Sequence, residues 1–281
     1  MLPPLKRCTI MSNVISKILL RYRYSTILLK QLVKTDFKLR YQSSVLGYLW
    51  SVLKPLFLFI IMYLVFVKVL NVNFGVKNSG AYLLLGLVIW GFFTEMTGGS
   101  VGSIVGKGDL LRKLNFPRYT IVLATGISAL INLTINMVVV FMFIFIGGNE
   151  MHFDAVLSPI LFAELFTIGM ALAFFLSAVY VRLRDIGYVW DVVLQAMFYA
   201  TPIFFPITLA PLWAQKLLIL NPVAQCLQDI RYLLISHNTP TITTIYGNHW
   251  MRLVPVGITL FCVVIAAMYF RSRSKYFAEE I

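Results

Sequence analysis

The chain has 281 residues, of which 59% are hydrophobic and only 12% are charged. Charged residues make up about a quarter of a typical soluble domain, so this composition excludes an ordinary soluble protein and predicts an integral membrane protein. The 24 Lys and Arg residues outnumber the 11 Asp and Glu residues, which in a soluble protein would suggest a nucleic-acid partner. The three cysteines and three histidines are scattered without metal-ligand spacing, so no metal site is expected.

Six apolar stretches approach or exceed the roughly 20 residues that a helix needs to cross the hydrocarbon core. Residues 1–26 are basic but lack the apolar core and cleavage site of a secretory signal, so we expect an uncleaved N-terminal extension. Residues 27–281 are then expected to form one all-α transmembrane domain. Its predicted spans run approximately over residues 45–69, 82–105, 121–146, 156–181, 189–207 and 253–270.

The basic residues are distributed unevenly between the two sides of this topology. With both termini in the cytoplasm, 19 of the 24 Lys and Arg residues fall in cytoplasmic segments, as the positive-inside bias requires. Membrane orientation and attraction to anionic lipids therefore account for the charge, without a nucleic-acid partner. The five basic residues expected on the outer side are Lys68, Lys77, Lys216, Arg231 and Arg252.

The segment ILLKQLVKTDFKLRY, residues 27–41, has a lysine at every fourth position beside a row of apolar residues. This pattern predicts an amphipathic helix lying along the cytoplasmic membrane surface. Asp36 and Arg40 are four residues apart, a spacing at which they can pair on its apolar side. The helix is either a plain interfacial anchor or a part of a gating mechanism, and the pattern does not choose between them.

Between the last two predicted spans, residues 201–236 contain four prolines that would break any single helix. The segment is nevertheless too apolar for a free external loop. We therefore expect short re-entrant helices that dip into the outer leaflet and pack against protein.

The loop GSIVGKGDLLRKLNFPR, which begins at Gly102, has some features of a phosphate-binding loop. Such a loop reads G-x-x-x-x-G-K-S/T. Here only three residues separate Gly102 from Gly106, and Lys107 is followed by Gly108, so no nucleotide site is expected. The segment instead predicts a short cytoplasmic helix that starts near Gly108 and ends before Pro117.

Several sequence blocks, in this order, carry a resemblance to a known family. They are DFKLRYQSSVLGYLWSVLKP, LLRKLNFPR, LSAVYVRLRDI, YATPIFFPI with LNPVAQCLQDIRYLL, and KYFAEEI. From about Lys34 to the C-terminus the chain resembles the membrane subunit of ABC-2 type polysaccharide exporters, which export O-antigen, teichoic acid or rhamnose-rich glycans. The resemblance implies a homodimer in the bacterial cytoplasmic membrane, bound to two copies of a separate ATPase that holds ATP and Mg.

The resemblance also implies that this chain is not an enzyme and binds no cofactor, and that its substrate is a glycan on a polyprenyl diphosphate. The short helix near Gly108 would then be a coupling helix that docks on the ATPase, with further contacts in the segment RLRDIGY. The coupling residues expected on this basis are Leu110, Leu111, Arg112, Lys113, Phe116, Arg184 and Asp185.

Basic residues beside the first span are candidates for receiving the diphosphate, although they equally fit the positive-inside bias alone. These residues are Lys34, Lys38, Arg40 and Lys54.

Aromatic rings can stack on the C–H faces of sugars and so suit a glycan path, although each ring could also serve helix packing or the membrane interface. A carboxylate inside a span usually faces a partner or a water-filled cavity, so Glu95 either lines the path or holds a structural hydrogen bond. The aromatic candidates are Tyr48, Trp50, Tyr63, Trp90, Phe92, Phe93, Phe198, Tyr199, Phe204 and Phe205.

Three other functional classes are alternatives to glycan export. A membrane enzyme acting on polyprenyl phosphates would need clustered acids to hold a metal, whereas the eleven acids here are scattered. An ABC-2 type exporter of a drug or another lipid keeps the fold and remains an alternative. A membrane scaffold without transport is the third class.

Overall fold

The computed structural model describes residues 25–36, 38, 47–76, 78–113, 116–148 and 153–280, apart from the side chains at positions 48, 278 and 279. Throughout these residues the regular structure is helical, so the expected all-α fold is confirmed. A helical segment at 25–36 comes first. It is followed by η1 (Gly47–Leu49), α2 (Trp50–Tyr63), η2 (Leu64–Val69), α3 (Ser79–Val101), α4 (Ser103–Gly106), α5 (Gly108–Lys113) and α6 (Tyr119–Ile146).

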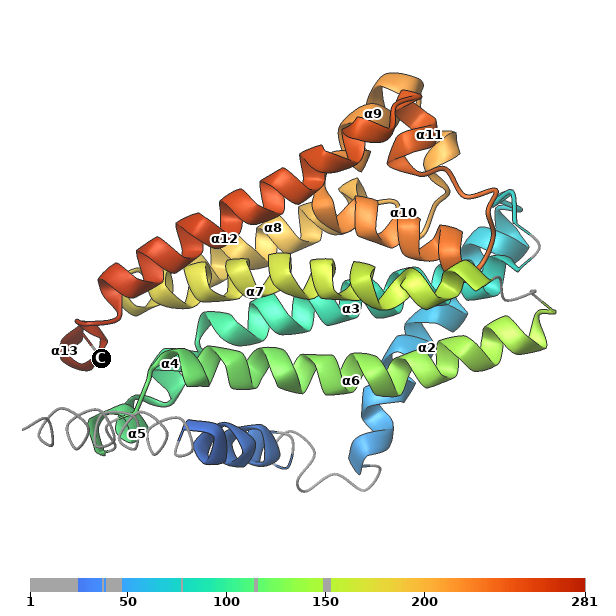
Figure 1. Ribbon diagram of the computed structural model, residues 1–281. Helices are drawn as coiled ribbons and strands as arrows, with labels where there is room; N and C mark the ends of the chain where they lie inside the picture. Colours follow the sequence, from blue (N-terminus) through green and yellow to red (C-terminus); the bar gives the residue numbers. More distant parts are fainter. Residues whose placement is uncertain are drawn as a thin grey trace, which may run out of the picture.

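The second half of the chain continues the helical bundle (Figure 1). Its elements are η3 (Phe153–Leu157), α7 (Ser158–Arg182), α8 (Ile186–Ala200), η4 (Ile207–Leu209), α9 (Leu212–Ile219), α10 (Pro222–Leu234), α11 (Ile242–Tyr246), η5 (His249–Arg252), α12 (Leu253–Arg273) and α13 (Phe277–Glu280).

Among the described residues, five helices are long and apolar enough to cross a membrane. They correspond to the first four and the last of the six predicted spans. They are Trp50–Val69, Ser79–Val101, Tyr119–Ile146, Phe153–Arg182 and His249–Arg273.

The fifth predicted span, residues 189–207, differs from the structure at both ends. Helix α8 begins at Ile186 and ends after 15 residues at Ala200. Thr201 is extended because Pro202 disfavours helical backbone in the residue before it. A 15-residue helix is about 22 Å long, less than the roughly 30 Å of the hydrocarbon core. A sixth crossing therefore stays a prediction.

Helix α3 is the centre of the bundle and α2 lies at its edge. In the most apolar part of each span, 83% of the residues are buried in α3 and only 6% in the span that α2 and η2 form together. A helix that is apolar all round belongs in a core, and α3 packs against α2, α6, α7 and α8. Helix α2 exposes large apolar side chains, so lipid or another protein chain must cover them. Examples are Phe57, Leu58, Ile60 and Ile61.

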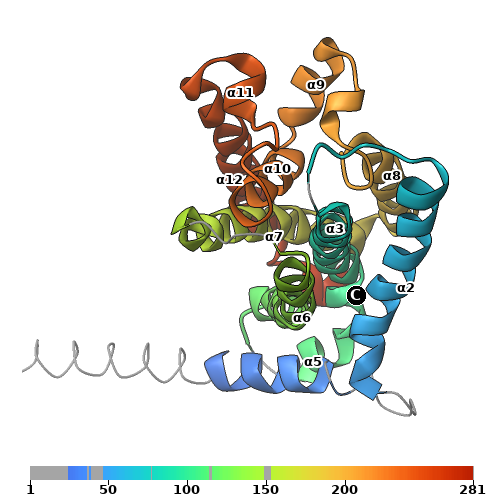
Figure 2. The same ribbon diagram turned by 90° about the vertical axis from the view of Figure 1, so that its right-hand side faces the viewer.

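The helical segment at 25–36 lies crosswise to the bundle: α3 and α6 are seen end-on in Figure 2, and this segment is seen from the side. Its Leu32 is buried together with Phe116, Ile121 and Ala124, which anchors it to the start of α6. The predicted helix before the first span is thus present. Its position on a membrane surface stays a prediction.

The predicted short helices between the last two spans are present as α9, α10 and α11, which gather at one end of the bundle (Figure 1). Helices α5 and α13 lie at the opposite end. Helix α10 is buried along most of its length and packs against α7. The segment is therefore packed against protein, as expected, whereas its insertion into the outer leaflet stays a prediction.

Arg231 in α10 was expected among the outer basic residues, and the structure buries it completely. Its guanidinium donates hydrogen bonds to the carbonyl oxygens of Pro202, Ile203 and Tyr82, and its central carbon lies 3.6 Å from the centre of the Tyr82 ring. Arg231 therefore joins α10, α3 and the segment that follows α8.

Candidate functional site

A cavity of about 590 Å³ lies between α2, α3 and α6. It brings together residues that were singled out for two different roles, the glycan path and diphosphate binding. The wall from α6 adds Leu133 and Asn136. The predicted residues that line it are Trp50, Lys54, Trp90, Phe92 and Glu95.

Glu95 is half-buried in this cavity and is held from α6. The amide of Asn132 donates a 2.6 Å hydrogen bond to Glu95 Oε2, and Asn136 donates to the backbone oxygen of Asn132 at 2.9 Å. The carboxylate thus lines a cavity and also makes a hydrogen bond between helices, so the two interpretations of Glu95 are compatible. Neither asparagine was among the predicted site residues, although two asparagines four residues apart in an apolar span are a detectable signal.

An aromatic cluster extends from the cavity to α8. The ring centres of Trp90 and Phe198 are 6.1 Å apart, those of Phe198 and Phe204 are 5.4 Å apart, and Phe66 of η2 lies 5.1 Å from Phe204. Tyr199 also contacts Phe198. Trp90 belongs to both the cavity and the cluster, so the predicted aromatic residues form one continuous surface. Phe205 contacts Phe204 at the far end of it.

Three predicted aromatic residues lie outside this surface or are not described. Phe93 is fully buried and packs against Trp90 inside the core. Tyr63 packs against Phe59 on α2, with ring centres 5.6 Å apart. The side chain of Tyr48 lies outside the described part of the chain.

A second groove, of about 510 Å³, lies between the first helical segment and α6. Lys30, Lys34 and Lys38 line it, so two of the four residues predicted to receive the diphosphate share one site. Lys54 belongs to the cavity between α2, α3 and α6, and Arg40 lies outside the described residues. The other lining residues of this lysine groove are the apolar Leu29, Val33, Ile127 and Ile131.

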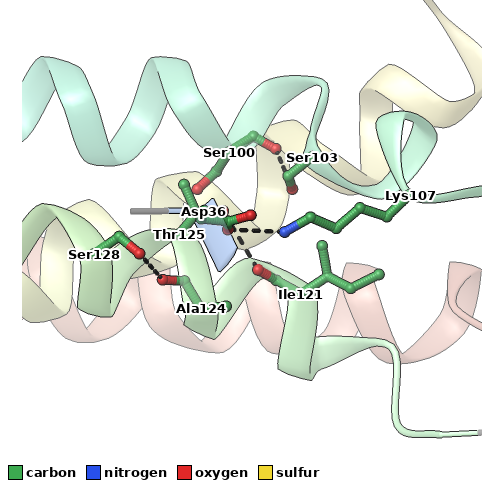
Figure 3. Close-up of polar contacts among 8 residues, drawn as sticks. All are labelled: Asp36, Ser100, Ser103, Lys107, Ile121, Ala124, Thr125 and Ser128. Carbon is green, nitrogen blue, oxygen red and sulfur yellow. Dashed lines mark hydrogen bonds and ion pairs between the residues drawn. The ribbon is translucent and has the colours of Figure 1, made fainter. Parts of the chain in front are cut away.

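An ion pair joins the first helical segment to the turn before α5 (Figure 3). Lys107 Nζ lies 2.8 Å from Asp36 Oδ2, and the two side chains are only 22% and 23% exposed. This contact joins residues 71 positions apart in the sequence, whereas the predicted local pairing of Asp36 with Arg40 lies outside the described residues and stays a prediction. A local spacing rule cannot find such a partner.

The hydroxyl groups around this ion pair are engaged with their own helices. A cavity of about 490 Å³ beside the pair is lined by Ser103, Thr125 and Ser128. Thr125 and Ser128 each donate to a backbone oxygen one turn earlier in α6. Figure 3 shows these bonds running along the helix, whereas the bond from Lys107 bridges two separate segments.

Helix α5 starts at Gly108, as predicted, and divides its side chains between two surfaces. Leu110 and Leu111 pack inward onto the cluster that contains Phe116. Arg112 and Lys113 remain exposed. Among the predicted coupling residues in α5, the two basic ones are therefore available to a partner protein and the two leucines hold α5 in place.

The turn between α7 and α8 presents further charges at this end of the bundle. Arg184 and Asp185 are both exposed there, and Arg184 lies 5.4 Å from the centre of the Tyr180 ring. The C-terminal helix α13 packs against α5 and α7. Within the described residues, no three His, Cys, Asp or Glu side chains are grouped closely enough to hold a metal ion.

Comparison with known proteins identifies the family. Residues 27–235 match the family described as ABC-2 type transporter. The chain is 28% identical over 262 residues to the O-antigen export system permease protein RfbA of Myxococcus xanthus, a match that covers 92% of this chain and 97% of that protein.

Two further relatives cover slightly less of the chain. A Klebsiella pneumoniae protein of the same name is 29% identical over 239 residues, covering 83% of this chain and 90% of that protein. The capsule polysaccharide export inner-membrane protein CtrC of Neisseria meningitidis is 24% identical over 218 residues, covering 76% and 80%. The family match spans most of the chain and agrees with the apolar helical bundle, so this chain belongs to the ABC-2 type transporter family and is a multi-pass membrane protein.

Proposed function

We propose that this chain is the permease subunit of an ABC transporter that exports a polysaccharide linked to a polyprenyl diphosphate. Relatives that align over most of their length are named as permeases for O-antigen export or as a capsule polysaccharide export protein. In this proposal two copies of the chain form the conduit, and two copies of a separate ATPase bind ATP and Mg. Both termini face the cytoplasm of a bacterium.

The lysine groove is the observation that carries this proposal. A polyprenyl diphosphate combines an apolar tail with two or more negative charges, so its site needs both an apolar floor and cationic groups. The groove offers Leu29, Val33, Ile127 and Ile131 as a floor, with Lys30, Lys34 and Lys38 around it.

The cavity between α2, α3 and α6 suits the sugar part of the substrate. Aromatic faces stack on sugar rings without strong directional demands, while Glu95 and Asn136 offer hydrogen-bonding groups for hydroxyls. Helices α2 and α8 lie on the same side of the bundle (Figure 2) and expose apolar side chains there. This side is where we place the second copy, so that the conduit forms between two such cavities.

Coupling to the ATPase is proposed to run through α5. Arg112 and Lys113 are exposed for docking, and the pair between Lys107 and Asp36 joins the turn before α5 to the first helical segment. A movement of α5 would therefore pull on the helix that carries the lysine groove. Through this link, closure of the nucleotide sites on the ATPase could move the lysine groove.

Depletion of the chain from its host tests the exported substrate. We expect a polyprenyl diphosphate-linked glycan to accumulate on the inner leaflet, detected by lipid extraction and mass spectrometry, and the wild-type chain to restore export. Replacing Lys34 and Lys38 with Gln is expected to weaken ATPase stimulation by the lipid carrier, with exposed Lys68→Gln on η2 as the matched control. Loss of drug or other lipid export without glycan accumulation would contradict the proposal.

Charge reversal on α5 tests the coupling. The double variant Arg112→Glu and Lys113→Glu is expected to lose either co-purification of the ATPase or export, since docking would place like charges together. Lys68→Glu at the other end of the bundle serves as the control. Intact co-purification together with normal export in the double variant would remove α5 as the coupling helix.

A further inference from the structure

A separate cavity, of about 700 Å³, lies between η3, the start of α7, α10, α11 and η5. Figure 2 shows α7 and α11 on one side of the bundle and α2 and α8 on the other, so this cavity faces away from the proposed glycan conduit. The cavity lies at the beginning of two spans, Phe153–Arg182 and His249–Arg273. The beginning of a span is the level at which lipid headgroups meet hydrocarbon. The cavity is therefore a candidate for a ligand other than the glycan.

Asp229 lines this cavity and lacks a partner on one carboxylate oxygen. The residue is only 5% exposed. Its Oδ2 accepts a 2.6 Å hydrogen bond from Gln225 and lies 3.5 Å from Arg252 Nη2, whereas Oδ1 has no hydrogen-bond partner within the described structure. An unpaired buried carboxylate oxygen bears the full cost of its desolvation, so a donor that reached Oδ1 would stabilise the site.

The charges around the cavity favour a donor that is also positive. Asp229 and the nearby Glu164 interact electrostatically with each other and with Arg252, and Asp154 adds a further acid to the lining, so acids outnumber the arginine there. An ammonium group would supply N–H donors to Oδ1 and the second positive charge. The side chain of Arg252 is 51% exposed, and His249 stands beside it in the cavity lining, so both can reach an anion at the mouth.

Apolar side chains continue the cavity toward the membrane. Leu161 and Leu233 line its inner part, and Leu157 at the end of η3 and Ile160 in α7 lead outward, where they are 53% and 65% exposed. A ligand that fits has an ammonium and an anion close together on one end and hydrocarbon on the other. Phospholipids with an amine headgroup meet all three requirements.

We propose that this cavity binds the headgroup of a phospholipid that carries a primary ammonium. The ammonium donates to Asp229 Oδ1, the phosphate lies against Arg252 and His249, and the acyl chains follow Leu157 and Ile160. The site does not depend on which substrate the chain exports.

Native mass spectrometry of the full-length purified chain tests this site with three lipids of identical acyl chains. The lipids are phosphatidylethanolamine, phosphatidylcholine and phosphatidylglycerol. Phosphatidylcholine has the same zwitterionic headgroup charge but no N–H donors. We therefore expect it to bind about tenfold more weakly than phosphatidylethanolamine, which corresponds to the loss of one charge-assisted hydrogen bond. Phosphatidylglycerol, which has no ammonium, is expected to bind at least as weakly.

Variants locate the effect within the protein. Asp229→Asn is expected to abolish the preference for phosphatidylethanolamine, and Arg252→Gln to weaken binding of that lipid, whereas exposed Asp191→Asn on α8 changes neither. Equal binding of phosphatidylethanolamine and phosphatidylcholine by the wild-type chain would overturn the proposal, and this comparison does not require any variant to fold. A preference for phosphatidylglycerol that Arg252→Gln removes would show a plain anion site and would also overturn it.

Discussion

Arg231 in α10 and Lys107 in the turn before α5 each join segments that are far apart in the sequence. Arg231 is fully buried and donates to three backbone oxygens, the most distant of them 149 residues away. Lys107 is about one-fifth exposed and forms an ion pair with Asp36. The two contacts lie toward opposite ends of the bundle.

The difference between these contacts lies in what can replace each partner. Water can solvate Lys107 and Asp36 if they separate, so breaking the pair costs little and the two segments can move apart. Water does not reach Arg231, so its carbonyl partners would stay unpaired if it left. The α5 end is therefore suited to movement, whereas the contact of α10 with α3 and residues 202–203 is suited to rigidity.

Removing the guanidinium should have the largest effect. Arg231→Met leaves the buried carbonyl oxygens of Pro202 and Ile203 without donors, at roughly 1–3 kcal/mol each, and removes a second donor from the Tyr82 oxygen, so we expect a loss on the order of 3 kcal/mol. Thermal unfolding of the full chain in detergent measures it. Exposed Arg184→Met is the control, and equal melting of the two variants would contradict the contrast drawn here.

Crowding the guanidinium should have the next largest effect. A Cβ at Gly86 would collide with the Arg231 side chain and lie 2.7 Å from the Ile203 oxygen, so Gly86→Ala is expected to cost about 1–3 kcal/mol. Gly91→Ala, one and a half turns further along α3, meets nothing within 4 Å and should leave stability unchanged or slightly raised. Parallel melting curves of the two variants decide the outcome.

Exchanging arginine and lysine at each position should show a smaller difference in stability between the two contacts. Arg231→Lys loses the forked geometry that reaches several carbonyls at once and should cost about 1–2 kcal/mol. Lys107→Arg keeps the ion pair with Asp36 and should stay within about 0.5 kcal/mol of the wild-type chain. Comparable losses at both positions would mean that the pair at Lys107 is as constrained as Arg231.

The smallest expected effect is the coupling energy between Asp36 and Lys107. A double-mutant cycle with Asp36→Lys and Lys107→Asp should give about 1 kcal/mol, decreasing as salt is added, because the pair is partly exposed. The swapped double variant should recover ATPase coupling that each single variant loses. Normal ATPase coupling in the single variants would show that this ion pair has no role in the transport cycle.

Much of the fold follows from the sequence because hydropathy and helix-breaking residues act locally. Five spans were predicted by their apolar length, and the start of α5 by Gly108. The end of α8 was missed because the apolar run continues past Ala200, while Pro202 had already ended the helix. In this stretch the backbone restriction outweighs the apolar composition.

The candidate site was predictable only where a residue is unusual in its own segment. Lys54 and Glu95 are charged residues in apolar spans, and both line the cavity between α2, α3 and α6. The pairing of Asp36 with Lys107 was not predictable from local spacing, since it depends on the packing of the first helical segment against α6. The burial of Arg231 was not predictable either, because charge patterning counts basic residues and cannot detect backbone oxygens as partners.

The Arg231 contact also constrains how the chain is made. Tyr82, Pro202 and Ile203 are translated before Arg231, so the three backbone oxygens wait for their donor until α10 emerges from the ribosome. Synthesis of the permease must therefore pass beyond residue 231 before α3 and the segment after α8 can be locked together. Up to that moment the carbonyl oxygens of Pro202 and Ile203 lack the donor that the finished protein provides.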